Sequence, residues 1–515
     1  MRIERDSKIM PQRSLPGLRL ASTLLLAMLL GGCVNLAPDY RQPAAPVAAN
    51  WAQTVDGKNI VVAQGNAATV AAENIGWQDF FIDERLREVI AQALQNNRDL
   101  RVAALNIEKA RAQYRIEDAT RYPAVSATGS GTASRTPGTL SSAGNATTSR
   151  QYSATLGVSA YELDFFSRLK NLSESALETY RYQIEIRRST HISLVAEVAA
   201  AWLKLASDQE LLQLAQDTLK SQSRTYELSQ RSHEIGTVSG VDLADQEASV
   251  ESARADVGRY TSQVAQDINA LNLLVGATLD ARLLPARLPD TAAALLSTPV
   301  DLPSDVLLRR PDVLAAEHTL IGAHADIGAA RAAFFPSITL TANGGTASSS
   351  LGGLFKAGSG AWSFAPSINL PIFNAGSNRA SLDAAVITRD IDVATYEKAI
   401  QTAFSEVADA LAERSTLDQR LTAQQKVAAA YEKSYKLSDA RYRTGIDSYL
   451  STLVSQRSLY SAQQTLISLR LTEQNNRITL YKVLGGGWSE KTQKVADAAD
   501  SASRSGRGTT SGVAE

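Results

Sequence analysis

The sequence predicts a mainly α-helical protein that also contributes four membrane-type β-strands, arranged as two similar halves. Three observations support this fold class. Residues 99–123 and 312–336 match at a constant offset, so the chain contains a long internal repeat. Each half has a pair of segments in which apolar and polar residues alternate. Each half then contains 68 residues without glycine or proline, at 168–235 and at 377–444.

The repeat covers about 210 residues, which is far longer than the unit of a solenoid protein. The segment RYPAVS at 121–126 returns as FFPSIT at 334–339, and Gly236 returns as Gly445. Two similar halves are expected to share one continuous body and to do the same physical job. The repeat therefore favours an architectural role over a catalytic one.

The composition argues against several classes of function. The chain has 515 residues, a formal net charge of -1 and a single cysteine. It lacks the basic footprint of a nucleic-acid-binding protein, and it can form neither an intrachain disulfide nor a cysteine-based metal cluster. Its 4 histidines include no i, i+4 pair, and no phosphate-binding loop or nucleophile motif occurs. We expect no enzyme activity, no metal and no cofactor.

The N-terminus predicts a lipoprotein signal peptide over residues 1–32. Basic residues precede an apolar run at 20–30, which is too short to span a membrane as a helix. Leu30, two glycines and Cys33 then resemble a bacterial lipobox, in which the cysteine receives the covalent lipid. The alternative is a plain signal peptide with an incidental free cysteine. Val34, in place of an aspartate, favours the outer membrane, and Met10 is a second candidate start.

The mature chain divides into a collar and two repeats. Residues 33–76 are rich in proline and alanine and are expected to form an extended, lipidated collar. The first repeat covers 77–300 and the second 301–488. The tail at 489–515 is expected to be disordered because it is rich in serine, glycine and threonine. Within each repeat we expect a helix pair, a strand pair, a long helix, a short tip and a return helix.

The strand pairs combine apolar residues with small polar ones at a period of two. In 152–160, for example, Tyr, Ala, Leu, Val and Ala alternate with Ser, Thr, Gly and Ser. Such strands, of about 10 residues, suit a membrane crossing with one face toward lipid and the other toward water. An ordinary soluble hairpin gives the same alternation. Polar loops are expected at 137–150 and 347–360.

The two glycine-free segments predict helices about 100 Å long, and such helices normally pack against other long helices. Each is expected to turn at a tip, at Gly236 or Gly445, and to return as a second helix. Ser239 with Asp242 three residues later loosely fits a capping box, and Ser448 is expected to cap the other return helix.

Four strands cannot close a membrane barrel, because single-chain barrels begin at about eight strands. Open sheet edges are not tolerated within lipid. If the strands lie in a membrane, several chains must therefore combine, and three chains would supply twelve strands. The long hairpins would then form an α-helical barrel that extends into the periplasm.

Several motifs, taken in order, resemble those of the TolC-like outer membrane factors, in particular the OprM- and NodT-like lipoprotein branch. The resemblance covers nearly all of the mature chain. The motifs are Cys33 followed by PDYRQP at 38–43, YELDFFSR at 161–168, RRPDV at 309–313, FPSI at 335–338, LPIFNAG at 370–376 and YRTGIDSYL at 442–450.

The resemblance implies a trimeric exit duct with a 12-stranded β-barrel in the outer membrane and an α-helical barrel in the periplasm. It implies two partners, a periplasmic adaptor (membrane fusion protein) and an inner-membrane pump, commonly of the resistance-nodulation-division (RND) type linked to multidrug resistance. The duct itself is passive. The alternative is a periplasmic coiled-coil lipoprotein that serves as adaptor or scaffold without a pore. Two hairpins, each preceded by a strand pair, argue against that alternative.

A duct of this kind needs a gate, which the resemblance assigns to the hairpin tips. Asp242 and Asp245 share a helix face, and three copies would place six carboxylates beside a narrow pore. The alternative is that both acids only stabilise a helix N-terminus.

The resemblance also implies that Tyr442 takes part in the contacts that hold the duct closed, with Arg441 and Arg443 as pairing charges. Asp447 is a further gate candidate. Relatives often carry an acid where this chain has Val454, so the constriction is expected to be lined differently. The tips at Gly236 and Gly445 are where the adaptor would dock, although these glycines also serve to permit tight turns.

Overall fold

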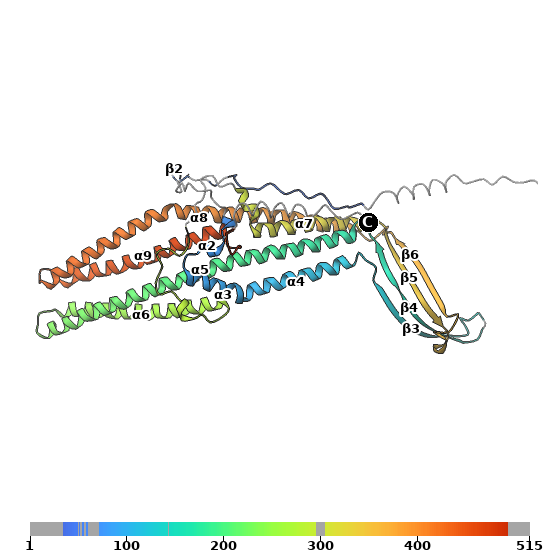
Figure 1. The fold of residues 1–515 in the computed structure, drawn as a ribbon, viewed down its shortest axis with the longest axis horizontal. Coiled ribbons are helices and arrows are strands. Elements are labelled where there is room, and N and C mark those ends of the chain that lie inside the picture. Colours follow the sequence, from blue (N-terminus) through green and yellow to red (C-terminus); the bar gives the residue numbers. More distant parts are fainter. Residues whose placement is uncertain are drawn as a thin grey trace, which may run out of the picture. The chain divides into compact units, whose positions relative to one another are not determined.

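The computed structural model describes residues 34–49, 51, 54–55, 58–59, 72–142, 144–294 and 304–492. The signal peptide, Cys33 and residues 493–515 lie outside this part of the chain, so the expectations for them stay predictions. The chain divides into two compact units, each assembled from separate segments (Figure 1). Unit 1 comprises Met1–Arg41, Arg111–Thr179 and Leu320–Asp392, and unit 2 comprises Gln42–Ala110, Tyr180–Thr319 and Val393–Glu515.

The two halves of the chain have nearly the same element order. The first contains α3 (Glu84–Asn96), α4 (Arg98–Ala119), β3 (Val125–Thr136), β4 (Thr147–Leu163), α5 (Arg168–Glu234) and α6 (Gly240–Val275). The second contains α7 (Pro311–Ala332), β5 (Ser337–Ser348), β6 (Gly360–Asn369), α8 (Ser377–Arg443) and α9 (Tyr449–Val483). Both α5 and α8 have 67 residues, which confirms the expected long helical hairpins.

Short elements complete the order. They are β1 (Thr54–Val55), β2 (Lys58–Asn59), the 3-10 turn η1 (Ala72–Asn74), α2 (Trp77–Phe80), and the 3-10 turns η2 (Ala281–Leu283), η3 (Ser304–Arg309) and η4 (Leu351–Gly353). Among the described residues, no helix has both the length and the apolar character needed to cross a membrane.

Two details of the elements differ from the expectation. The second half has η3 and one α-helix in place of a helix pair, because Pro311 disfavours helical backbone at the residue before it and is itself well suited to the first turn of α7. The expected loop at 137–150 is also too long. β4 begins at Thr147, since the serines and threonines there pair with β3, and the hydroxyls of Ser134 and Ser149 lie 2.8 Å apart.

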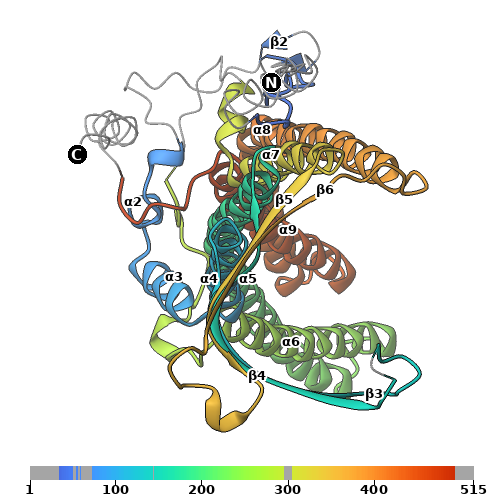
Figure 2. The same ribbon diagram turned by 90° about the vertical axis from the view of Figure 1, so that its right-hand side faces the viewer.

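Unit 1 contains one antiparallel sheet in the order β3-β4-β5-β6, and the strands follow one another in this order in Figure 2. The central β4–β5 ladder joins the two halves of the chain and runs from Tyr152 opposite Ser348 to Leu163 opposite Ile338. A register shift between Val158 and Tyr161 interrupts this ladder. Each outer strand, β3 and β6, therefore has a neighbour on one side only within the described chain.

The register places apolar and polar side chains on opposite faces of this sheet. Leu156 lies opposite Ala127 on β3 and Gly344 on β5, and Gly344 lies opposite Trp362 on β6. The other face carries hydroxyl groups, and those of Ser130 and Ser153 are 2.7 Å apart. The alternation expected from the sequence is thus present across all four strands.

The start of the collar packs on unit 1 through close backbone approach. A Cβ atom on Gly328 of α7 would lie 2.8 Å from the Cα of Ala37, so glycine is required at this contact. The Arg331 guanidinium donates a hydrogen bond of 3.0 Å to the carbonyl of Leu36.

Unit 2 holds the main apolar core. Trp202 of α5 is fully buried, and its indole N–H donates to the Leu283 carbonyl at 3.0 Å. Phe80 stacks on Tyr481 with ring centroids 3.9 Å apart. In both hairpins the helices pack antiparallel, and both tips lie at the same end of unit 2 (Figure 1).

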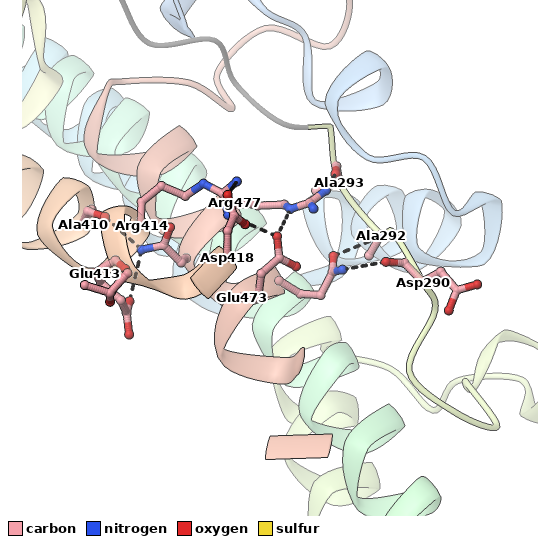
Figure 3. A network of polar contacts seen from close by, with 12 residues as sticks. Asp290, Ala292, Ala293, Ala410, Glu413, Arg414, Asp418, Glu473 and Arg477 are labelled. Atoms are coloured by element: carbon pink, nitrogen blue, oxygen red, sulfur yellow. Dashed lines mark hydrogen bonds and ion pairs between the residues drawn. The ribbon is translucent and has the colours of Figure 1, made fainter. Parts of the chain in front are cut away.

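A polar network ties α8 and α9 to the segment that precedes the second half (Figure 3). Glu473 is buried and accepts hydrogen bonds from Arg414 and Arg477. Arg477 also donates to the Ala293 carbonyl at 3.0 Å. Because the carboxylate has two cationic partners, its burial is compensated.

The first residues of the expected tail have definite partners. The N–H of Trp77 donates to the Ser489 carbonyl at 2.9 Å, and the Thr492 hydroxyl donates to Asp79 at 2.6 Å. These residues, 489–492, are the described part of the tail.

Gly276 ends α6 in the left-handed conformation, with φ 76, and a Cβ atom there would lie 2.5 Å from the Asn96 carbonyl oxygen. We expect Gly276→Ala to destabilise the protein by more than the ~1–2 kcal/mol that left-handed backbone alone costs. The matched control is Gly258→Ala, because Gly258 lies inside α6 and its Cβ atom would meet nothing within 4 Å.

Gly258→Ala should raise stability by about 0.5–1 kcal/mol, since alanine favours the helix. Thermal unfolding of the detergent-solubilised variants, followed by circular dichroism, checks both signs. A Gly276→Ala protein that melts with the wild type would contradict the close approach at this helix end.

Candidate functional site at the hairpin tips

The residues singled out as a gate gather at the two hairpin tips of unit 2. The first tip connects α5 to α6, and the second connects α8 to α9 (Figure 1). Both turns are built in the same way, as the internal repeat leads one to expect. The differences between them lie in the side chains.

At the first tip, Gly236 adopts φ 79 and donates its N–H to the His233 carbonyl at 2.9 Å. Ser239 is the N-cap of α6, and its hydroxyl accepts from the Asp242 N–H at 3.0 Å while donating to the Asp242 carboxylate at 2.7 Å. The Ser239 half of the expected capping box is therefore present, whereas the Asp242 carboxylate binds the Ser239 hydroxyl instead of the Ser239 backbone N–H. Asp242 therefore stabilises the start of α6, which agrees with the interpretation that this acid stabilises a helix N-terminus.

At the second tip, Gly445 adopts φ 76 and donates to the Tyr442 carbonyl at 2.9 Å. Ser448 is again the N-cap, but its side chain makes no capping hydrogen bond, so this expectation is wrong. At the first tip, Asp242 orients the serine hydroxyl. The equivalent position at the second tip is Ser451, which has no carboxylate to do so.

A Cβ atom at either tip glycine would meet nothing within 4 Å. The need for glycine at these positions is thus conformational rather than steric, since φ is positive at both. Gly236 and Gly445 are exposed, which leaves their backbone groups accessible to a partner.

The arginines of the second tip already have partners within their own hairpin. Arg441 binds Asp447 through two hydrogen bonds, of 2.6 and 3.1 Å. Arg443 pairs with Asp439 at 2.9 Å, one helical turn back along α8. The hydrogen bond from Arg441 lowers the pKa of Asp447, so this carboxylate stays ionised over the whole neutral range.

An aromatic pair lies beside these charges. The rings of Tyr442 and Tyr449 meet edge-on, with centroids 5.3 Å apart. Burial raises the pKa of Tyr449 to about 12, and the charges of Tyr442, Tyr435 and Asp245 act in the same direction. Asp245 is itself exposed. Val454 is also exposed, at 56%.

Side-chain hydrogen bonds connect the two return helices above the tips. The hydroxyl of Tyr460 donates to Asp256 at 3.0 Å, and Gln464 donates to the hydroxyl of Tyr260 at 3.1 Å. Nearer the tips, Arg457 donates to Ser249 at 3.3 Å. These three side-chain hydrogen bonds therefore join α6 of the first hairpin to α9 of the second.

The structure adds three residues that the sequence did not single out. Asp439 holds Arg443, Tyr449 packs on Tyr442, and Gln246 is 1% exposed with neither side-chain polar atom hydrogen-bonded among the described residues. A signal for Asp439 existed in its i, i+4 spacing from Arg443. The burial of Gln246 has no sequence signal, because it depends on how α6 packs against other helices.

The tips can form charged and aromatic contacts, but they offer no arrangement for metal binding. Within the described ranges, no group of three or more His, Cys, Asp or Glu residues is placed to hold a metal ion.

Comparison with known proteins assigns the chain to a family. The sequence profile described as "Outer membrane efflux protein" matches residues 89–277 and 302–486, which is more than half of the chain. The two matched segments correspond to the two halves recognised from the internal repeat.

Individual relatives match over nearly their whole length. The chain is 51% identical to "Probable efflux pump outer membrane protein TtgC" of Pseudomonas putida, over 92% of this chain and 96% of the relative. It is 43% identical to "Cation efflux system protein CusC" of Escherichia coli, over 90% and 98%. The crystal structure of the open state of the Neisseria gonorrhoeae MtrE outer membrane channel superposes with a TM-score of 0.78 at 40% identity, over 89% and 100%.

These matches confirm the mainly helical fold with membrane strands and the role as an outer-membrane channel component of an efflux system. They also support a transport duct rather than an enzyme, and they favour the channel over a periplasmic scaffold without a pore. The chain therefore belongs to the outer membrane efflux protein family, as the resemblance of its motifs indicated.

Proposed function

We propose that three copies of this chain form a closed exit duct, in which each copy supplies four of twelve barrel strands. The observation that supports this most directly is the four-stranded sheet with β3 and β6 at its edges. In a bilayer an open edge leaves backbone groups without partners, which is very costly. When β3 of one copy pairs with β6 of the next, no open edge is left and the three copies form a closed cyclic assembly.

The duct would work within a tripartite efflux system. A periplasmic adaptor would dock at the tips around Gly236 and Gly445, where backbone is exposed, and an inner-membrane pump of the RND type would supply the energy. Cys33 would carry the lipid that anchors the mature N-terminus in the outer membrane. The names of the relatives, which include pump and cation efflux proteins, support such partners.

The tips would act as the gate. Asp242 and Asp245 from three copies would form an acidic constriction that favours cations, and the Arg441–Asp447 pair with the Tyr442–Tyr449 contact would hold each hairpin in its closed form. Arg443, held by Asp439, would stiffen the end of α8. The side-chain bonds between α6 and α9 support a gate that moves as one body.

The assembly predicts a native mass of three lipidated chains for the detergent-extracted protein. Native mass spectrometry of the outer-membrane fraction measures this mass. Cys33→Ser should remove the lipid mass and leave the trimer intact, because the shared sheet rather than the lipid joins the chains. A monomer, or wild-type protein that is released without detergent, would contradict the shared barrel.

The acidic constriction predicts a change in conductance when its carboxylates are removed. Asp242→Ala combined with Asp245→Ala should raise single-channel conductance or reduce cation preference in planar bilayers. Glu247→Ala is the control, because Glu247 is an exposed acid on the same helix turn. If the double variant and the control both conduct like the wild type, the two aspartates are helix-stabilising residues only.

We expect the Arg441–Asp447 ion pair to restrain the second tip equally at all pH values near neutrality. Because the pKa of Asp447 is lowered, the pair is complete above the ordinary value of 3.8 and is lost only as the pH falls through the lowered value. Arg441→Gln should therefore increase the open fraction of single channels between pH 5 and 8, whereas the wild type should stay closed over this range. Equal open fractions at pH 7 would show that the pair does not contribute to closure.

A further inference from the structure

The loop end of the four-stranded sheet carries positive charge and no negative charge. Within residues 125–161 and 337–369, the charged residues are Arg135, Arg150 and Lys356. Arg135 is near the end of β3, Arg150 is near the start of β4, and Lys356 lies in the connection between β5 and β6. All three are exposed. This end of the sheet is therefore locally basic, although the whole chain has a net charge of -1.

The two arginines are neighbours on the apolar face of the sheet. Arg150 lies opposite Ala133, and Arg135 lies opposite Thr148, so they form a diagonal pair about 7–8 Å apart. Because side chains alternate along a strand, Arg150 shares a face with Tyr152 and Leu156. The hydroxyl-rich face, which the proposed duct turns toward its water-filled interior, is the opposite one.

The arginines lie where the apolar band of the sheet ends. Val125 to Ala133 covers about 26 Å along β3 at 3.3 Å per residue. A strand tilt of about 40° reduces this to about 20 Å, close to the apolar band of membrane barrels, which is about 25 Å high. Arg150, opposite Ala133, is thus at the boundary, and Arg135 is one step beyond it. A lipid-facing arginine is costly at the membrane centre but tolerated at this depth.

Neither guanidinium has a partner within the described part of the chain. Among the described residues, no hydrogen bond or ion pair involves Arg135 or Arg150. Guanidinium groups bind phosphate oxygens with two parallel hydrogen bonds, which makes arginine suited to phosphorylated headgroups. The partner that this position and charge fit is an anionic lipid rather than a solute in the duct.

We propose that Arg135 and Arg150 form a binding site for the phosphate groups of the phosphorylated glycolipid, lipid A, in the outer leaflet of the outer membrane. This inference rests on the proposed function, which places the apolar face toward lipid and the loop end outside the cell. In a trimer the site occurs three times. Bound glycolipid would neutralise the six guanidinium groups and fix the height of the barrel in the membrane.

The test measures lipid binding by the trimer in detergent, using native mass spectrometry with bisphosphorylated lipid A. Three ligands are compared, namely this lipid, the same lipid after removal of both phosphates, and inorganic phosphate. Wild type should retain the bisphosphorylated lipid only. Arg135→Gln with Arg150→Gln should bind it about tenfold more weakly, because both charge-assisted contacts are lost.

The control moves one charge to the other face without changing the net charge. Arg150→Gln with Gln151→Arg keeps one guanidinium in β4 but turns it toward the polar face, so lipid binding should fall although the charge is conserved. Equal binding of lipid A by wild type and the double glutamine variant would overturn the site, and so would equal binding of dephosphorylated lipid or of inorganic phosphate.

Channel recordings on the same preparations test the proposed duct separately from the proposed lipid site. If wild type and the double glutamine variant conduct equally, the result supports the duct in both proteins. The lipid-binding measurements alone then test the lipid site. If the wild-type protein forms no channels, this result contradicts the proposed duct and also the lipid site, which rests on the duct.

Discussion

The pairing of β4 with β5 is the constraint on which the membrane part depends. It joins strands from the two halves, with Tyr152 opposite Ser348, and makes one sheet from two hairpins. Duplication therefore extends the sheet but cannot complete it, because β3 and β6 each keep one ladder of backbone groups unpaired in the described chain. An open ladder is tolerable in water and very costly in lipid. In the proposed duct, neighbouring copies would pair with these two edges.

Much of this architecture could be predicted because its signals are local and long. The two segments without glycine or proline became α5 and α8, Gly236 and Gly445 took the positive φ angles that tight turns need, and the period of two became a sheet with one apolar face. Details that depend on a neighbouring residue or strand of the same chain were harder to predict. Ser239 and Ser448 occupy equivalent positions, but only the first has an acid three residues later to complete a cap. Likewise, Thr147 lies in a polar stretch that looks like a loop until β3 is beside it.

The candidate gate was predicted as a set of charges, whereas its pairing was not. Arg441 and Arg443 seemed free to bridge neighbouring chains, yet Asp447 and Asp439 satisfy them within one hairpin. Exposed pairs of this kind are weak, since water competes for both partners. Such ion pairs can break easily, so they suit a tip whose contacts change when the gate opens better than one whose contacts are permanent. Among the gate candidates, Asp242, Asp245 and Tyr442 take part in no ion pair within the described chain.

In the proposed assembly, neighbouring copies would also cover exposed apolar side chains on the helices. Several large apolar residues of the hairpin helices are exposed, among them Leu228, Leu273, Leu437 and Val454. A helix with one buried face shows one apolar stripe, whereas a helix packed on two sides needs a wider one. The exposed apolar residues on α5, α6, α8 and α9 would form this second stripe. Closing the ring of helices would cover the second face at the same step that pairs β3 with β6. Helical packing and strand pairing would then stabilise a single assembly, so that neither barrel needs to form before the other.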